Sequence, residues 1–191
     1  MKAPVGEVFD SIQGEGLYMG EQQIFVRFFG CNLKCRYCDT VMHRYVEYEP
    51  EGLLEEVKRY QRTTDVISYT GGEPLLHKDF LKAMLPLAHR CNFRNYLETN
   101  GTLPGALSEV IEYVNVIAMD MKLPSSTGLE PQWDVHREFL KIALTKDVFI
   151  KVILCESTVG EDIREVISII RNFIMRRCWC CSLTVMRISI T

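Results

Sequence analysis

Three cysteines on one short segment carry the clearest chemistry in the sequence. Cys31, Cys35 and Cys38 are spaced C-x3-C-x2-C within CNLKCRYCDT. Thiolates are the usual ligands of iron–sulfur clusters, and three of them can bind three irons of a cubane. The fourth iron would then lack a protein ligand, and an open metal position leaves room for chemistry. A zinc knuckle completed by His43 is the structural alternative.

Glycines and polar residues follow the apolar runs that we interpret as strands. The segment GGEP, residues 71–74, follows the run 66–70, and its glycines allow a ligand to approach the backbone. Its glutamate can accept a hydrogen bond from an ammonium group, although such a segment alone is more often a turn. Glu98 and Asn100 lie at the end of the next run, and DMKLPSS lies at the end of the one after. Ligands collect at the carboxyl ends of parallel strands, so we expect these residues to share one site.

Tyr37 occupies an aromatic position between the second and third cysteines. The pattern C-x3-C-x-aromatic-C resembles the signature of radical S-adenosylmethionine (SAM) enzymes. In that family SAM chelates the open iron of a 4Fe–4S cluster, and reductive cleavage gives a 5′-deoxyadenosyl radical. The resemblance implies SAM binding by Tyr37, Gly71, Gly72, Glu73, Asn100, Asp120, Met121 and Lys122.

The segment before the cysteines narrows the family. The stretch FDSIQGEGLYMGEQQIFVRFFGCNLKCRYCDT, residues 9–40, is similar to the 7-carboxy-7-deazaguanine synthase (QueE) family. The similarity continues through SYTGGEPLL, ETNGT and MDMKLPSS, to about Met175. Enzymes of that family are carbon–nitrogen lyases of queuosine and 7-deazapurine biosynthesis. They contract the ring of 6-carboxy-5,6,7,8-tetrahydropterin, which gives 7-carboxy-7-deazaguanine and ammonia.

A pterin presents an amide and a guanidine-like edge, so its site needs a few placed donors and acceptors. Gln13, Glu15 and the backbone of residues 12–14 can supply them, while Gly14 and Gly16 permit close approach. A glycine-rich turn without a ligand is the alternative. Thr70 resembles a family position that contacts the substrate. The predicted substrate-binding residues are Ile12, Gln13, Gly14, Glu15, Arg27 and Thr70.

Arg27 lies within an apolar run, on the same strand face as Phe25 and Phe29. A guanidinium among phenylalanines is costly unless it meets an anion. The substrate carboxylate is the predicted anion, because arginine binds carboxylates in bidentate fashion. An arginine on the solvent face, or one paired with an internal glutamate, is the alternative.

The resemblance also implies Mg2+, an electron donor such as flavodoxin or ferredoxin, and a homodimer. Thr40 matches the family position whose hydroxyl binds Mg2+, a hard cation that prefers oxygen ligands. Asp39 would be the choice on charge alone. Two other functions stay open: an activase of glycyl-radical enzymes, which shares the cysteine spacing, and a non-enzymatic zinc module.

The composition predicts a soluble cytoplasmic protein. The chain has 191 residues, 47% of them hydrophobic and 25% charged, as in an ordinary single globular domain. Its net charge of -3 gives no basic surface for nucleic acid. No apolar run reaches the roughly 18 residues that span a bilayer, so we expect no membrane partner. In a reducing compartment the 8 cysteines are expected to be free, catalytic or metal-bound.

Short apolar runs alternate with helical patterns, which predicts a parallel sheet covered by helices. The predicted strands are residues 24–29, 66–70, 96–99, 114–119, 148–154 and 183–190, with helices near 53–60, 80–85, 106–113, 136–144 and 163–173. Pro86 should end or kink the second helix. Six strands are too few for a closed eight-stranded barrel. We therefore predict an α/β fold, the open partial (β/α)6-type barrel typical of radical SAM enzymes, with a doubly wound sheet as the alternative.

The C-terminus departs from the family pattern. Family members usually carry a Pro-Gln-x-His-Lys-like run near the substrate, whereas residues 176–191 read RRCWCCSLTVMRISIT. Cys178, Cys180 and Cys181 lie too close together for a second cluster site. We divide the chain into a radical SAM core with an N-terminal substrate-binding segment, residues 1–175, and an atypical tail, residues 176–191. Whether the C-terminal part of the fold is complete stays open.

Overall fold

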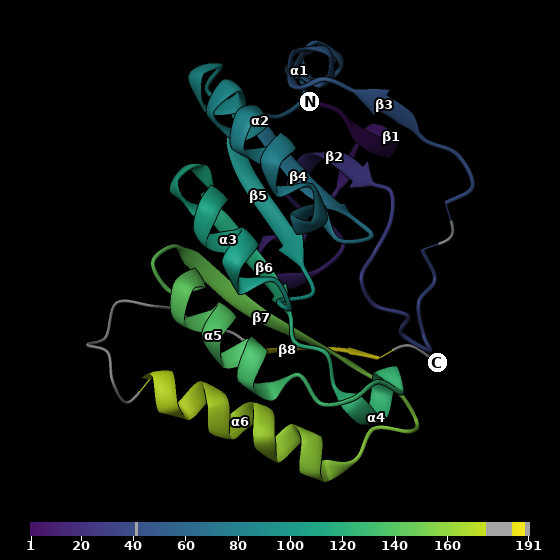
Figure 1. Cartoon of the computed structure of the whole chain (residues 1–191), viewed down its shortest axis with the longest axis vertical. Helices are drawn as coiled ribbons and strands as arrows, with labels where there is room; N and C mark the ends of the chain where they lie inside the picture. Colours follow the sequence, from purple (N-terminus) through teal and green to yellow (C-terminus); the bar gives the residue numbers. More distant parts are fainter. Residues whose placement is uncertain (41, 175–184, 190–191) are drawn as a thin grey trace.

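Residues 1–40, 42–174 and 185–189 are described by the structure, a computed structural model. Their strands form one open eight-stranded sheet in the order β3-β1-β2-β4-β5-β6-β7-β8 (Figure 1). A parallel core comprises β2 (Gln22–Phe28), β4 (Val66–Gly71), β5 (Arg94–Thr99), β6 (Val116–Asp120), β7 (Asp147–Leu154) and β8 (Val185–Ser189). Next to it, β1 (Ala3–Ile12) pairs antiparallel with both β2 and β3 (Val46–Tyr48). The predicted α/β class with an open sheet is confirmed.

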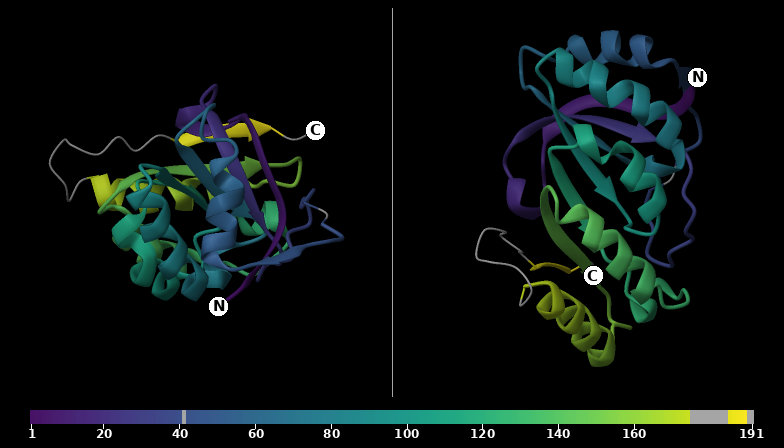
Figure 2. Two further views of the ribbon diagram at one scale, coloured as in Figure 1. Left: turned by 90° about the horizontal axis from the view of Figure 1, so that it is seen from above. Right: turned by 60° about the vertical axis from the view of Figure 1, so that its left-hand side comes forward.

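Helices follow the strands and cover one face of the sheet (Figures 1 and 2). The long ones are α1 (Pro50–Lys58), α2 (Lys78–Arg90), α3 (Pro104–Val110), α5 (Trp133–Ala143) and α6 (Gly160–Ile174). The short ones are η1 (Gly16–Tyr18), η2 (Pro74–His77), η3 (Ile111–Tyr113) and α4 (Pro124–Thr127). A proline stands in the first turn of α1, η2, α3 and α4, where its missing N–H has no helical partner to lose. No helix within the described residues is long and apolar enough to cross a membrane.

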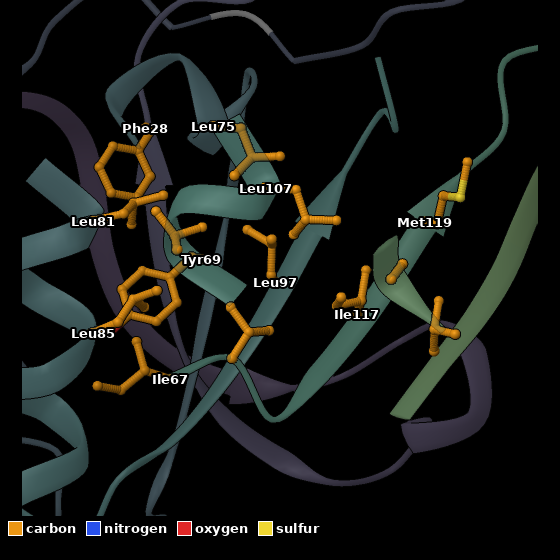
Figure 3. Packing of buried hydrophobic residues seen from close by; sticks show 14 of the residues in the cluster. Phe28, Ile67, Tyr69, Leu75, Leu81, Leu85, Leu97, Leu107, Ile117 and Met119 are labelled. Carbon is orange, nitrogen blue, oxygen red and sulfur yellow. The ribbon is translucent and has the colours of Figure 1, made fainter. Parts of the chain in front are cut away.

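The two faces of the parallel strands differ because side chains alternate along a strand. Ile67, Tyr69, Leu97, Ile117 and Met119 point into the apolar core beneath the helices (Figure 3). The alternate positions of β4, β5, β6 and β7 carry Ser68, Thr70, Glu98, Asp120 and Lys151. The uncovered face of the sheet is therefore polar toward the carboxyl ends of its strands.

The six predicted strands and five predicted helices are all present, with shifted ends. Pro86 does not end the second helix, because α2 continues through it to Arg90. Interior proline costs a helix about 3 kcal/mol. Here the apolar face of α2 is buried on both sides of it, with Met84 and Leu85 before and Ala88 after, so packing offsets that cost. Strands β1 and β3 were not predicted. The division at residue 175 stays a prediction, and the three tail cysteines lie outside the described residues.

Candidate active site

A cavity of about 620 Å³ lies on the polar face, at the carboxyl ends of the parallel strands. The cavity is lined by β1 and the loop after it, by β2 and the cysteine loop after it, and by the ends of β4 to β7. The predicted site residues found in its lining are Ile12, Gln13, Gly14, Glu15, Arg27, Cys31, Cys35, Tyr37, Cys38, Thr40, Thr70, Gly71, Gly72, Asn100, Asp120 and Lys122. Glu73 and Met121 are fully buried behind this lining.

The backbone of the cysteine loop, residues 30–40, is anchored at two points. Gly30 O accepts from Glu73 N at 2.8 Å, and Arg36 N donates to Thr127 O at 2.9 Å. A Cβ on Gly72 would collide with the Gly30 carbonyl, so the glycine allows the GGEP segment to press against the start of this loop. The loop is therefore fixed at its start and near its middle.

The three thiols face the same cavity and are all free. Burial raises the pKa of Cys31 and Cys35 in the metal-free chain. Among the described residues no three His, Cys, Asp or Glu side chains converge on a single ion. A cubane does not require such convergence, because each cysteine binds a different iron. The three residues thus fit a cluster bound at the cavity wall; His43, the fourth ligand of the zinc alternative, is exposed.

Asn100 connects the cysteine loop to the end of β5. Its Nδ2 lies 2.9 Å from Asn32 Oδ1 and 3.8 Å from Cys31 Sγ, within hydrogen-bonding distance of sulfur. Asn32 Nδ2 in turn donates to Thr102 Oγ1 at 2.9 Å. These side chains hold the first cysteine against the strand ends.

Glu73 closes the back of the site. Its carboxylate accepts hydrogen bonds from Leu75 N (3.0 Å), Thr99 Oγ1 (2.9 Å) and Asn100 N (2.8 Å). Burial raises its pKa to about 7, against the opposing effect of these donors. In this structure the carboxylate supports the strand ends from behind, and its predicted contact with SAM stays a prediction.

A buried ion pair lies on the opposite side of the cysteine loop. Lys122 Nζ is 2.7 Å from Asp120 Oδ2 and 3.1 Å from the Tyr37 hydroxyl. Burial is the largest single effect and lowers the pKa of Lys122, but the Asp120 carboxylate and the Tyr37 hydroxyl together outweigh it, so the net shift is upward and the lysine is charged. Asp120 Oδ1 is buried without a protein partner. This oxygen is an acceptor available to a ligand or a water in the cavity.

The loop after β1 reaches the sheet through polar side chains. Gln13 is buried and donates to Glu98 Oε1 at 2.8 Å. Glu15, which is half exposed, pairs with Lys151 Nζ at 2.9 Å, and that same Nζ lies 3.3 Å from Glu98 Oε2. A lysine, two carboxylates and an amide thus form one network beside the cavity.

Arg27 lies at the rim of the cavity, on β2. It pairs with Glu7 of β1 at 3.2 Å and stacks over the Phe9 ring, with its side chain 43% exposed. The alternative of pairing with an internal glutamate therefore holds in this structure, and the guanidinium also faces the cavity. Thr40 and Asp39 both line the cavity on the side of the cysteines, so their placement leaves the choice of Mg2+ ligand open.

Comparisons with known proteins agree with one another. The family model for the Radical SAM superfamily matches residues 25–186. A 7-carboxy-7-deazaguanine synthase of Geobacter sulfurreducens is 42% identical over 179 residues, which cover 82% of this chain and 71% of that protein. The chain belongs to the 7-carboxy-7-deazaguanine synthase family. The synthase of Methanothermobacter thermautotrophicus is 45% identical over 130 residues, 64% of this chain and 51% of that one.

Solved structures support the fold of this synthase family member. QueE from Escherichia coli aligns with a TM-score of 0.55 at 21% identity and covers 97% of this chain and 94% of its own. TYW1 with a lysine–pyruvate adduct bound gives a TM-score of 0.58 at 18% identity, over 78% of this chain and 60% of its own. Membership of the radical SAM superfamily implies a 4Fe–4S cluster and SAM as cofactors.

Sequence reasoning missed Lys151, although the synthase-family chain carries a signal for it. It is the one charged residue within the apolar run VFIKVIL, and a lysine in a central strand needs a partner. Its partners could not be found locally, because Glu15 is 136 residues away along the chain.

Proposed function

We propose that this chain converts 6-carboxy-5,6,7,8-tetrahydropterin into 7-carboxy-7-deazaguanine and ammonia, by ring contraction without net oxidation. The observation that carries the proposal is one cavity shared by the cysteine loop and the QGEG loop, in a chain 42% identical to a 7-carboxy-7-deazaguanine synthase. A cofactor site alone would fit many radical SAM enzymes. The second loop supplies the acceptors and glycines that a pterin requires.

The cofactors would lie on the cysteine side of the cavity. Cys31, Cys35 and Cys38 would hold the cluster, and the strand-end residues would hold SAM. When bound, the cluster and SAM supply the radical chemistry that removes a hydrogen atom from the substrate. Lys122 offers a fixed positive charge to a carboxylate there, and Asp120 Oδ1 offers an acceptor to an ammonium or hydroxyl group.

The pterin would lie between the loop after β1 and the sheet. Glu15 uses one carboxylate oxygen for Lys151, which leaves the other for the guanidine-like edge of a pterin. Arg27 would bind the substrate carboxylate. Glu7 engages only its Nη1 in this structure, and a guanidinium carries five N–H donors, so others are available. The Phe9 and Phe25 rings, stacked at 5.3 Å, border this position and limit the access of water.

Further partners belong to the same proposal. Thr40 would bind Mg2+ through its hydroxyl, with substrate oxygens and water completing the shell. A flavodoxin or ferredoxin would supply the electron, and two copies of the chain would form a homodimer. The position of Thr40 in the cavity lining supports the Mg2+ assignment.

The test is a direct assay on anaerobically reconstituted protein. Incubation with 6-carboxytetrahydropterin, SAM, Mg2+ and a reductant should give 7-carboxy-7-deazaguanine by mass spectrometry. A brown protein with the absorbance of a cubane that cleaves SAM but leaves the pterin unchanged would exclude this substrate. A colourless protein that retains zinc would exclude the whole proposal.

A further inference from the structure

Strand β7 contacts the loop after β1 at three successive positions of one face. Asp147, at its start, accepts a hydrogen bond from the Tyr18 hydroxyl. Phe149, two residues on, packs against Gly16 so closely that a Cβ there would collide with the ring. Lys151, two residues further, pairs with Glu15. The loop therefore lies along β7 from Glu15 to Tyr18, and this strand supports it.

Lys151 makes the contact nearest the cavity. Its side chain is only 7% exposed, so its ammonium group has lost nearly all of its water. Burial would lower its pKa, but Glu98 and Glu15 outweigh that effect and raise it, so the group is charged. A buried ammonium is tolerated only when its partners are in place. The position of Glu15 is thus coupled to the buried Lys151 ammonium group, which needs Glu15 as a partner.

Glu98 gives this lysine a rigid support. Its Oε1 accepts from Gln13 Nε2 at 2.8 Å and from Ser68 Oγ at 3.3 Å. Its Oε2 accepts from Lys151 at 3.3 Å and lies 3.5 Å from Thr70 Oγ1. Because β4, the loop and β7 all donate to it, the carboxylate is fixed in the sheet. Glu15 has no comparable set: its carboxylate is half exposed, and Lys151 is the partner found for it among the described residues.

We propose that Lys151 is a positioning residue that carries the Glu15 carboxylate to the cavity, so that β7 sets the shape of the substrate loop. The inference rests on the proposed function for the identity of the substrate. The placement of the loop by Lys151 does not depend on it. Without the ammonium, Glu15 would turn to solvent, and the neighbouring negative charge of Glu98 would repel it.

The test is a double-mutant cycle on the reconstituted holoenzyme. Lys151→Met keeps an unbranched side chain that is one atom shorter and removes its charge, and Glu15→Gln removes the charge of its partner. If Lys151 acts through Glu15, each single variant should raise the KM for the pterin about tenfold or more, the size expected for a lost hydrogen bond to a charged group. The double variant should then be no worse than either single one. Additive effects on KM, or a loss confined to kcat, would overturn the inference.

Two measurements keep the result independent of folding and of the substrate. The reconstituted variants should keep the absorbance of the cluster, because its three cysteine ligands lie on the cysteine loop. SAM cleavage is not the control, because Lys151 lies beside Asp120 across β6 and β7. Hydrogen exchange should show the amides of Gln13 and Gly20, which close the loop by backbone bonds, exchanging about tenfold faster in Lys151→Met. Unchanged exchange rates would show that Lys151 does not hold the loop after β1 in place. If the wild type fails to convert the pterin while the variant still shows faster exchange in the loop, the proposed substrate is wrong, and the positioning role of Lys151 stands.

Discussion

The cysteine loop and the loop after β1 border the same cavity, but the protein holds them differently. In the cysteine loop, residues 30–40, Cys31 and Cys38 are exposed, and the anchors are backbone bonds at Gly30 and Arg36 together with side-chain bonds of Asn32. In the loop after β1, residues 13–21, the predicted substrate-binding side chains are themselves engaged, Gln13 with Glu98 and Glu15 with Lys151. In the first loop most of the functional atoms, the cysteine sulfurs, lack protein partners within the part of the chain that the structure describes. In the second loop the functional side chains are already bound to other residues of the protein.

This difference follows from what each loop would hold. Thiolates that bind iron are positioned by the metal itself, and metal binding supplies ordering energy to its ligands. The pterin ring forms no metal–ligand bonds with the loop, so the groups that recognise it must be preorganised by the protein. Changes in the cysteine loop should therefore abolish chemistry outright, whereas changes in the other loop should weaken substrate binding with the cofactor chemistry intact.

The largest effect is expected for Cys38→Ala. Loss of one of three protein ligands should prevent formation of a stable cubane, and SAM cleavage should fall below detection. Absorbance of the reconstituted protein and chromatography of the SAM products measure the two effects. Cys155→Ala is the matched control, since Cys155 is a half-buried free thiol that does not border the cavity among the described residues. A Cys38→Ala protein that cleaves SAM at the wild-type rate would remove this residue from the cluster.

Gly16→Ala should separate the two loops. Gly16 has a φ of +75°, and a Cβ would also collide with the buried Phe149 ring. The positive φ costs an alanine about 1–2 kcal/mol and the overpacking against Phe149 costs about 1–3 kcal/mol, so the loop should move away from β7. We expect a rise of about 10- to 100-fold in the KM for the pterin, with the cluster and SAM cleavage retained.

Gly105→Ala controls for the substitution itself. Gly105 lies in α3, has open space at its Cβ position, and is remote from the cavity lining. That variant should keep the wild-type KM and should be equally stable or slightly more stable. Equal KM values for Gly16→Ala and the wild type would show that the loop tolerates displacement. Preorganisation of the loop after β1 would then not be needed for substrate binding.

The sequence predicted one loop better than the other for a physical reason. Cys31, Cys35 and Cys38 lie within eight residues of chain, so their spacing alone states what they can bind. The role of Glu15 depends on Lys151, a residue 136 positions away, and no local pattern connects the two. Resemblance to a family located Glu15, while its support became visible only when β7 was placed beside it.

Elements of the fold divide in the same way. The six parallel strands are apolar runs bounded by turns, which the sequence shows directly. Strand β1 reads APVGEVFDSI, with charges and a glycine at a register shift between Val5 and Glu7, and it becomes a strand by pairing with β2 and β3. Pro86 is the converse case, because a strong local rule is overridden by packing on both sides of it. Local chemistry was predictable, and long-range compensation was not.

Thr40→Ala should have a smaller effect, confined to the response to Mg2+. If the hydroxyl binds the metal, the variant should keep its cluster and SAM cleavage and lose about tenfold in turnover, a typical cost of removing one hydrogen bond to a charged group. Titration of Mg2+ against product formation measures this. Asp39→Asn is the matched comparison, since both residues line the cavity. A variant at Thr40 with a normal Mg2+ response, beside an Asp39→Asn protein without one, would move the metal to Asp39.

The last effect is one on stability, and it is expected for Glu73→Gln. The pKa of Glu73 rises from 4.5 to about 7 on folding because of burial, so the folded chain binds this proton more tightly than the unfolded chain. Its contribution to stability is therefore fully present below about pH 4.5 and is lost as the pH rises through about 7, up to about 3 kcal/mol. The glutamine side chain has no such proton. It places an amide opposite Asn100 N or Leu75 N, which costs the same free energy at every pH.

Urea unfolding of the metal-free wild type and variant at several pH values between 4.5 and 8 tests this. The wild type should lose stability relative to Glu73→Gln across that range. His136, whose pKa burial lowers to about 4, contributes a slope of opposite sign below 6.5. That slope is present in both proteins, so it cancels in their difference. A difference that stays constant with pH would mean that Glu73 is ionised in the folded chain throughout this range, stabilised by its three donors. A negative charge would then lie behind the cavity lining at each of these pH values.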